Sequence, residues 1–246
     1  MKLLMHTCCA PCSVACVQTL RAEGIQPTAY WFNPNIHPYT EYRARRDTLV
    51  SYAQSIGMAL LLEDDYGLRP FVDAVAGDIG GRCPVCYAAR MRRTARYAAE
   101  HGFTHVTSTL FISPYQRHEL LRAAAEQAAE EFGVAFLYRD FRPAFRRGQE
   151  EARALGLYMQ KYCGCVFSEE ERFDKRFRNA LRGKAQAGAA EDGAEEAARR
   201  AAMRGLREAG LRFEAAWEAH RRTLAGEPGG EDGGGAREPP QPKRGA

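Results

Sequence analysis

The sequence predicts an α/β protein built on a Rossmann-like parallel sheet with helices on both faces. Through about residue 180, short apolar runs alternate with longer amphipathic runs, which is the pattern of repeated strand–helix units. The chain has 246 residues, of which 45% are hydrophobic and 27% are charged, as is ordinary for globular proteins. No run approaches the roughly 20 apolar residues of a membrane span. A fibre, a wholly disordered chain and a membrane-spanning protein are therefore not expected.

The expected elements follow one another in strand–helix order. The strands are expected at residues 2–6, 28–32, 58–62, 104–110 and 134–138. The helices are expected at residues 11–23, 39–57, 69–76, 83–101, 114–132 and 143–155.

Proline, glycine and asparagine residues typical of helix ends and turns support several of these boundaries. Pro11 suits the first turn of the first helix, and Gly24 suits its end. The second strand, TAYWF, closes at the turn signal Asn33-Pro34-Asn35, and Gly57 ends the second helix. Ligands of such sheets bind beyond the carboxyl ends of the strands. A cluster of cysteines directly follows the first expected strand and is therefore expected at this edge.

The composition of the chain changes near residue 180. Downstream of that point Ala, Gly, Glu and Arg dominate, with a helix-forming stretch at 193–224. Residues 225–246 are rich in Gly, Pro and charge and cannot bury a core. The sequence predicts a working domain at 1–180 and an appendage at 181–246, made of one helix and a disordered tail.

Charge alone says little about partners. The chain has 35 Lys and Arg against 31 Asp and Glu, a formal net charge of +4. This balance neither requires nor excludes nucleic acid. Basic residues cluster with aromatic residues at 90–97 and 139–153, where contacts to phosphates and bases compete with the default of a solvated helix face.

Cysteine is the most informative residue type in the chain. The eight cysteines are Cys8, Cys9, Cys12, Cys16, Cys83, Cys86, Cys163 and Cys165. The N-terminus lacks the long apolar region of a secretory signal, so a cytoplasmic protein is expected. Because the cytoplasm is reducing, metal binding or redox catalysis explains these thiols better than a disulfide framework.

The first cysteine group, Cys8-Cys9-Ala10-Pro11-Cys12, follows the first strand and opens a helix. A helix N-terminus lowers the pKa of a thiol and favours the thiolate that metals and redox chemistry require. Buried structural cysteines are a poor alternative for three thiols in five residues. Cys16, four residues further into the helix, is interpreted mainly as a small core residue.

The second group, Cys83-Pro84-Val85-Cys86, brings two thiols onto one metal or cluster. A structural zinc site with four cysteines usually repeats this unit, and the sequence has no second copy. Cys8 and Cys9 are candidates for the other two ligands. Four thiolates suit zinc and an iron–sulfur cluster equally, and the spacing does not decide between them.

The third group is Cys163-Gly164-Cys165. Two cysteines at this spacing can close a small strained disulfide, which is easily reduced. Two further metal ligands are an equal alternative.

Taken together, the motifs resemble the cobalamin-independent epoxyqueuosine reductase family, QueH. The matching segments are CCAPCS (8–13), WFNPNIHPYTEY (31–42), GRCPVCYAARM (81–91), FISPYQRHE (111–119), YRDFRPAFRRGQ (138–149) and LGLYMQKYCGCVFSE (155–169). They occur in order over nearly all of 1–170, whereas the region after 180 shows no resemblance.

The resemblance implies a fold of the adenine-nucleotide alpha-hydrolase type and the reduction of epoxyqueuosine to queuosine at the tRNA wobble position, the final step of queuosine biosynthesis. It implies a 4Fe-4S cluster on Cys8, Cys9, Cys83 and Cys86, and a redox-active pair formed by Cys163 and Cys165. A further iron beside the cluster is attributed to the family, with Cys12 as its candidate ligand here. The implied partners are the tRNA anticodon loop and an electron donor that the sequence does not identify.

The chemistry of the residues agrees with a reductase. Removing an epoxide oxygen needs two electrons and two protons, and a dithiol delivers two electrons as it closes to a disulfide. His37, Glu41 and Asp140 are candidate general acids from their placement alone.

Two alternatives remain at this point. One is an ATP-using tRNA-modifying enzyme of the same fold, although the turn at Cys8–Ser13 lacks the glycines that cradle phosphate. The other is a zinc-stabilised nucleic-acid-binding module without catalysis.

Overall fold

A computed structural model describes residues 1–176 and 195–225, with side chains from residue 205 onward in the second range. Its five strands form one parallel sheet in the order β3-β2-β1-β4-β5. They are β1 (Leu3–His6), β2 (Pro27–Trp31), β3 (Leu60–Leu62), β4 (His105–Ser108) and β5 (Ala135–Phe136). The expected α/β fold with a Rossmann-like parallel sheet is confirmed.

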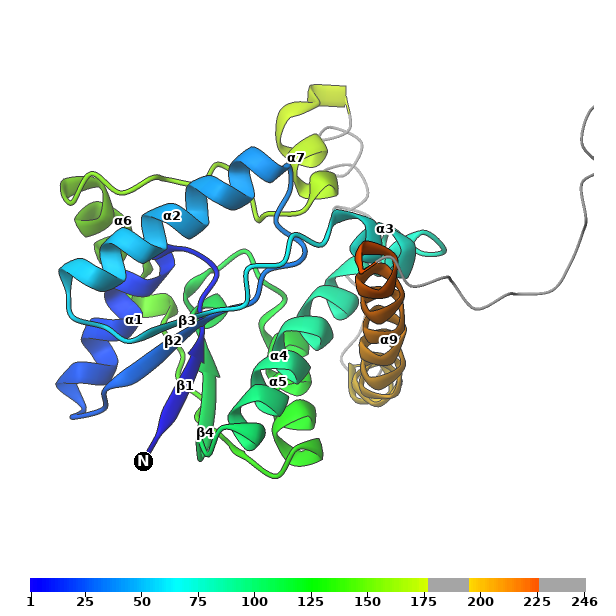
Figure 1. Ribbon diagram of the computed structural model, residues 1–246, viewed down its shortest axis with the longest axis horizontal. Coiled ribbons are helices and arrows are strands. Elements are labelled where there is room, and N and C mark those ends of the chain that lie inside the picture. Colours follow the sequence, from blue (N-terminus) through cyan, green and yellow to red (C-terminus); the bar gives the residue numbers. More distant parts are fainter. Residues whose placement is uncertain (177–194, 226–246) are drawn as a thin grey trace, which may run out of the picture.

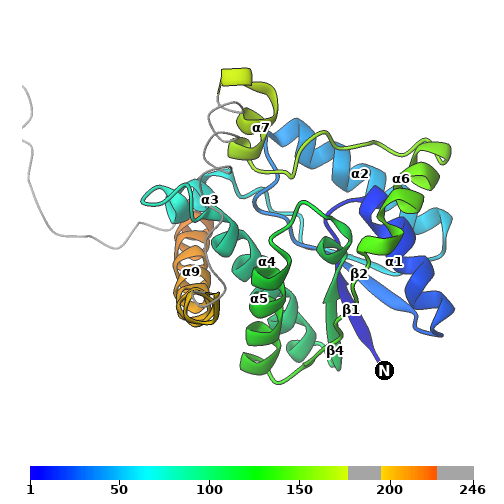
Figure 2. The same ribbon diagram turned by 180° about the vertical axis from the view of Figure 1, so that it is seen from behind.

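Helices cover both faces of this sheet (Figures 1 and 2). They are α1 (Ala10–Ala22), α2 (Tyr39–Ser55), α3 (Leu68–Val75), α4 (Arg82–Glu100), α5 (His118–Glu131), α6 (Phe145–Ala154), α7 (Val166–Phe173) and α9 (Glu195–Leu224). Helices α1, α2 and α6 lie on one side, and α4 and α5 lie on the other (Figure 1).

The structure corrects several expected boundaries and adds one helix. The strands expected at 58–62 and 134–138 are shortened to Leu60–Leu62 and Ala135–Phe136. The fourth strand ends at Ser108, whose side chain accepts a hydrogen bond from Leu110 N at 3.1 Å and starts the 3-10 turn η1 (Thr109–Ile112). The expected helix at 114–132 begins only at His118, because Ser113 to Gln116 forms a turn. Helix α7 was not expected from the sequence.

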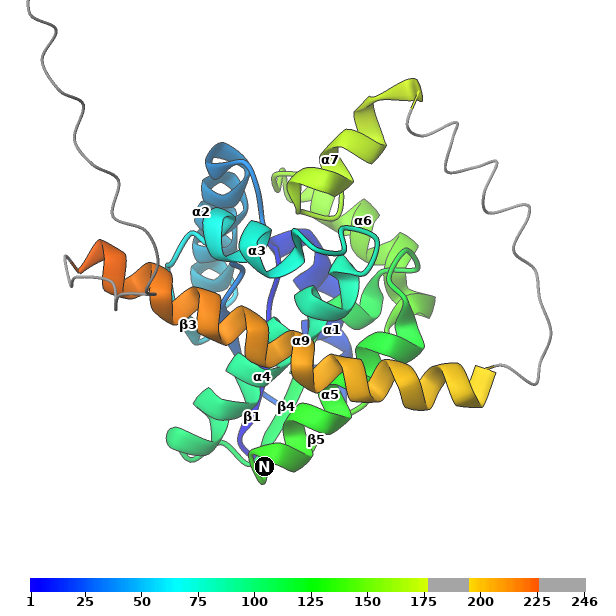
Figure 3. The same ribbon diagram turned by 90° about the vertical axis from the view of Figure 1, so that its right-hand side faces the viewer.

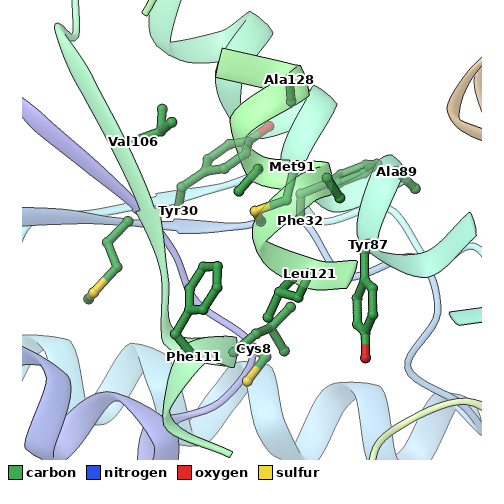
Figure 4. Close-up of a cluster of buried hydrophobic side chains, with 14 of the residues drawn as sticks. Cys8, Tyr30, Phe32, Tyr87, Ala89, Met91, Val106, Phe111, Leu121 and Ala128 are labelled. Carbon is green, nitrogen blue, oxygen red and sulfur yellow. The ribbon is translucent and has the colours of Figure 1, made fainter. Parts of the chain in front are cut away.

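The core lies between the central strands and the helices that cover them. β1 is buried along its whole length, as expected for a strand flanked by neighbours on both edges and by helices on both faces. Figure 4 shows Cys8 beside Phe111 and Leu121 at the border of this apolar cluster. The core therefore extends to the carboxyl edge of the sheet, where the first cysteines lie.

Helix α9 lies across the outer side of α3, α4 and α5 (Figure 3). Phe213 and Trp217 stack on each other with ring centroids 5.6 Å apart, and both meet the edge of Phe32. Gly210 allows a close approach to α4, since a Cβ atom there would lie 2.3 Å from Arg92 Cδ. The helix expected at 193–224 thus shares the core with the first 176 residues.

The division of the chain at residue 180 remains a prediction. The tail expected to be disordered, 225–246, lies outside the described residues except for Ala225. Within the described ranges, no helix combines the length and the apolar character needed to cross a bilayer.

Candidate active site at the carboxyl edge of the sheet

The site begins at the point where the strand order reverses, between β1 and β4. Cys8 and Cys9 form the turn from β1 into α1, and Thr109 follows β4 directly beside them. The backbone N–H of Cys8 donates to Thr109 Oγ1 at 3.2 Å, and the Thr109 hydroxyl lies 3.6 Å from Cys8 Sγ. This edge therefore fixes Cys8 through both its backbone and its sulfur.

Cys8, Cys9 and Cys12 form one buried group, called here the N-terminal thiol group. Their sulfur atoms all lie within 4.8 Å of one another, and the Cys8 and Cys9 sulfurs are 3.7 Å apart. Gln160, from the segment before α7, donates from Nε2 to Cys12 Sγ at 3.3 Å. Three thiols at this spacing suit the coordination of a soft metal.

The three thiols of this group differ in acidity. Hydrogen bonds from Cys12 and Cys9 hold the pKa of Cys8 well below its ordinary value, with the charge of Arg90 and the Thr109 hydroxyl acting in the same direction. Burial raises the pKa of Cys9, and the hydrogen bond to Cys8 raises that of Cys12. Cys8 is therefore the thiol of this group that most readily gives up its proton to a metal.

Cys83 and Cys86 lie in the first turn of α4, which starts at the same edge. Asn35, in the loop after β2, donates from Nδ2 to Cys86 Sγ at 2.9 Å. Burial raises the pKa of both thiols, and the charges of Cys163 and Cys165 raise each pKa further. The second and third cysteine groups of the sequence are thus electrostatic neighbours.

The four thiols assigned to a cluster by resemblance do not form one tight group in this structure. Among the described residues, the N-terminal thiol group is the only set of three or more Cys, His, Asp or Glu with ligand atoms within 4.8 Å. Cys83 and Cys86 share the carboxyl edge and the core cluster with it. Their role as cluster ligands with Cys8 and Cys9 remains a prediction.

The Cys163–Cys165 turn is held by the buried Arg45 side chain of α2 and by the backbone of the β2–α2 loop. Arg45 donates to the carbonyl oxygens of Tyr162 and Cys163, at 3.0 Å each. His37 contributes its backbone N–H to Gly164 O at 2.8 Å. Gly164 has φ +152°, and a Cβ there would lie 3.3 Å from Ile36 Cγ1, so glycine is required.

The two cysteines of this turn differ in exposure. Cys163 is exposed and Cys165 is buried, and all eight cysteines are free thiols. Gln116 donates from Nε2 to Cys163 Sγ at 3.3 Å, while its Oε1 accepts from the Tyr87 hydroxyl at 2.7 Å. The Tyr87 contact orients the amide so that its N–H groups face the exposed sulfur.

A cleft of about 910 Å³ opens above this edge. Its lining includes Cys8, Cys12 and Cys163, together with Gln116 and Gln160. Members of the first and third cysteine groups thus face one space that is large enough for a nucleoside. A substrate there reaches both the N-terminal thiol group and the exposed thiol.

The candidate general acids are committed to other partners, and none of them is part of the lining of this cleft. His37 donates from Nε2 to Pro34 O at 3.0 Å and accepts from Val166 N at 3.3 Å. Glu41 pairs with Arg45, and Asp140 pairs with Arg142.

The two basic clusters of the sequence differ in the partners of their arginines and in their position relative to the cleft. In the first, at 90–97, the arginines are committed inside the protein: Arg92 and Arg96 pair with Glu214, and Arg93 pairs with Glu63. In the second cluster, at 139–153, Arg146 and Arg153 line the cleft.

Sequence reasoning missed Arg45 and Gln160, two residues that shape the site. Asn35 and Gln116, by contrast, lie in polar runs that follow expected strands, and this position marks them as candidates for the walls of the site. Arg45 and Gln160 carry no such signal, because Arg45 lies inside an ordinary amphipathic helix and Gln160 lies in a loop. Only the folded chain brings them to Cys163 and Cys12.

Fold and site together define a Rossmann-like α/β protein with a thiol-lined cleft at its switch point. The family model described as epoxyqueuosine reductase QueH matches residues 3–171. The epoxyqueuosine reductase QueH of Dehalococcoides mccartyi is 40% identical over 174 residues, covering 71% of this chain and 96% of the relative. Those of Histophilus somni and Haemophilus influenzae are 35% and 34% identical, each covering 68% of this chain, and 72% and 71% of the relative.

The chain belongs to the epoxyqueuosine reductase QueH family and is an oxidoreductase. The match ends inside α7, so α9 lies outside it. Membership favours the reductase over the ATP-using enzyme and over a binding module without catalysis.

Proposed function

We propose that this protein reduces epoxyqueuosine to queuosine at the wobble position of tRNA, the final step of queuosine biosynthesis, in the cytoplasm. The observation that carries the proposal is the cleft in which Cys8, Cys12 and the exposed Cys163 face one space. An epoxide bound there meets thiols of two kinds. One kind is buried and grouped for a metal, and the other is exposed for redox chemistry.

The thiol chemistry of the donor set and the grouping of Cys8, Cys9 and Cys12 support an iron–sulfur centre. Cys8, Cys9, Cys83 and Cys86 would hold a 4Fe-4S cluster, and Cys12 is the candidate ligand of an additional iron. Thiolates are the ligands that such clusters require. Hydrogen bonds from Asn35 to Cys86 and from Gln160 to Cys12 supply the outer contacts that orient sulfur ligands.

The reaction balances with a dithiol as the immediate reductant. Opening the epoxide and losing its oxygen as water consumes two electrons and two protons, and leaves an alkene. Oxidation of Cys163 and Cys165 to a disulfide releases two electrons and two protons. A cluster held by these cysteines would supply one-electron transfer between an external donor and the disulfide, which takes up two electrons and two protons to return to the dithiol.

The residues around the turn hold the pair in place for this step. Arg45 fixes the two carbonyl oxygens before and at Cys163, and Gln116 holds the exposed sulfur toward the cleft. Cys165 is buried at the N-terminus of α7. In the proposed step its thiol forms the disulfide with Cys163. Cys163 is thus the thiol that first meets a substrate or donor.

The proposal is tested on full-length protein purified without oxygen. We expect iron and acid-labile sulfide, broad visible absorption, and conversion of epoxyqueuosine in tRNA with a chemical reductant. Cys163→Ser and Cys165→Ser should abolish turnover and retain iron, whereas Cys9→Ser should lose iron. Cys16→Ser is the matched control, since this thiol lies in the core of α1 away from the cleft lining.

Colourless protein with one zinc and no iron would contradict the cofactor assignment. Full turnover by both Cys163→Ser and Cys165→Ser would contradict the dithiol step.

A further inference from the structure

Tyr115 is an aromatic side chain left in solvent beside the candidate redox thiol. It is 83% exposed and lies in the turn between η1 and α5, next to Gln116. Its backbone N–H donates to Ser113 Oγ at 3.3 Å, and its ring meets the edge of Phe145, with centroids 6.1 Å apart. The turn thus presents a supported aromatic ring at the cleft, one residue from the group that holds Cys163.

Cations without acidic partners line the same cleft. They are Arg146 and Arg153 of α6, Lys161 of the following loop and Arg172 of α7. Across residues 1–176 and 205–225, none of these four forms an ion pair, whereas Arg147, beside Arg146, pairs with Glu151. The lining also includes Glu150 and Glu171, and Glu171 pairs with Arg82. The cations outnumber these acidic side chains, so the cleft attracts an anion.

We infer that this rim is the docking surface for a single-stranded nucleic acid loop, which stacks an unpaired base on Tyr115 and places its phosphates against Arg146, Arg153, Lys161 and Arg172. Unpaired bases of RNA loops stack on aromatic side chains, and phosphates bind cations without regard to sequence. The inference rests on the proposed function, because it names how the tRNA substrate is held. A base stacked on Tyr115 lies beside the turn that presents Cys163.

The arrangement favours a loop over a duplex. In a double helix the base faces are covered, so an exposed ring finds nothing to stack on. A protein partner would meet a lining in which apolar side chains such as Leu110 and Met159 lie among unpaired cations, whereas the centre of a protein interface is depleted of charged residues. The aromatic ring and the free cations together match the stacking platforms and basic grooves of single-strand binders.

The test measures binding, so that it does not depend on turnover. The probe is a fluorescein-labelled anticodon stem-loop with guanosine at the wobble position, and the competitor is a blunt duplex of the same stem. Anisotropy is read with full-length protein over a range of salt concentrations. Tyr115→Leu should weaken loop binding about tenfold and leave duplex binding unchanged, whereas Tyr115→Phe should bind within about twofold of wild type, because stacking needs only the ring.

The cations are tested in the same assay. Arg146→Gln and Arg153→Gln should each lower the salt slope of log K by about 0.7, the value expected for one phosphate contact on a single strand. Arg147→Gln is the matched control on the same helix, because Arg147 is not part of the cleft lining and lies 3.9 Å from Glu151. Its affinity and salt slope should equal those of wild type.

The outcomes separate the two proposals. If wild type binds and converts its tRNA but Tyr115→Leu and the two arginine variants bind like wild type, the docking surface is wrong and the proposed function stands. If wild type does not prefer the stem-loop to the duplex, the docking surface fails, and conversion of epoxyqueuosine in tRNA then decides the proposed function separately. If Tyr115→Phe is as weak as Tyr115→Leu, the stacking role is overturned.

Discussion

Asn35 joins the Cys86 thiol to the buried guanidinium of Arg90. Its Oδ1 accepts from Arg90 Nε at 2.7 Å, so its Nδ2 is turned to Cys86 Sγ at 2.9 Å. Arg90 is 2% exposed, and within the described residues it forms no ion pair with a carboxylate. The Asn35 amide thus directs an N–H donor at the Cys86 sulfur and accepts a hydrogen bond from the buried Arg90 guanidinium.

Replacement of Asn35 should be costly. Asn35→Leu removes both hydrogen bonds and leaves the Arg90 guanidinium buried without this partner, so we expect a loss of about 2–4 kcal/mol in the free energy of unfolding. Urea denaturation without oxygen measures it. Gln54→Leu, at the exposed end of α2, should change stability by less than about 0.5 kcal/mol.

Asn35→Asp separates the two bonds of this amide. A carboxylate keeps an acceptor for Arg90 but has no N–H for Cys86. We expect stability near that of wild type but a lower iron content, measured by metal analysis of purified protein. Equal iron in Asn35→Asp and wild type would show that the N–H to sulfur contact is dispensable.

Gly164→Ala should disturb the Cys163–Cys165 turn. Its φ of +152° is unfavourable for any residue with a Cβ, and the added atom meets Ile36 Cγ1 at 3.3 Å. We expect a loss of about 1–3 kcal/mol in stability and a clear fall in turnover, since the turn must shift. Gly77→Ala, where nothing lies within 4 Å of the added atom, serves as the control and should be neutral.

Stability should fall in acid because of His37. Burial lowers the pKa of His37 from 6.5 to about 4, opposed by its hydrogen bond to Pro34 and aided by the charge of Arg90. Between pH 6.5 and 4 the unfolded chain binds a proton that the folded chain excludes, so stability is full above pH 6.5 and is lost on acidification through this window. Protonation of Nδ1 also removes the acceptor of Val166 N.

The measurement is the free energy of unfolding of wild type and His37→Gln at several pH values. The difference between them should change by about 3 kcal/mol across the window, the equivalent of the lowered pKa. His6, whose pKa burial lowers to about 3, is present in both proteins and cancels in the difference. A constant difference from pH 7 to 4 would refute the role of His37.

Helix α9 should behave as part of the core. Phe213 is 1% exposed against α4 and Phe32, so Phe213→Ala should cost about 3–5 kcal/mol by leaving a cavity. Leu224→Ala, at a position 74% exposed on the same helix, should cost less than about 0.5 kcal/mol. Thermal denaturation compares them, and equal melting temperatures for both variants and wild type would mean that the helix is a separate appendage.

Much of the fold followed from the sequence by itself. Alternating apolar and amphipathic runs determined the parallel sheet and its helices, because each period matches only one kind of backbone. The clustering of cysteines after the first strand also placed the site, since parallel strands bring their carboxyl ends to one edge. The resemblance to the QueH family rested on the same ordered motifs.

The tertiary structure alone decided which side chains meet. Arg45 reaches the Cys163 turn across 118 positions of the chain, and Gln160 reaches Cys12 across 148. It also decided that α9 contributes Phe213 to the core and that Tyr115 stays in solvent. Sequence periodicity reports the local environment of each segment, whereas these contacts depend on how distant segments pack, which no local pattern encodes.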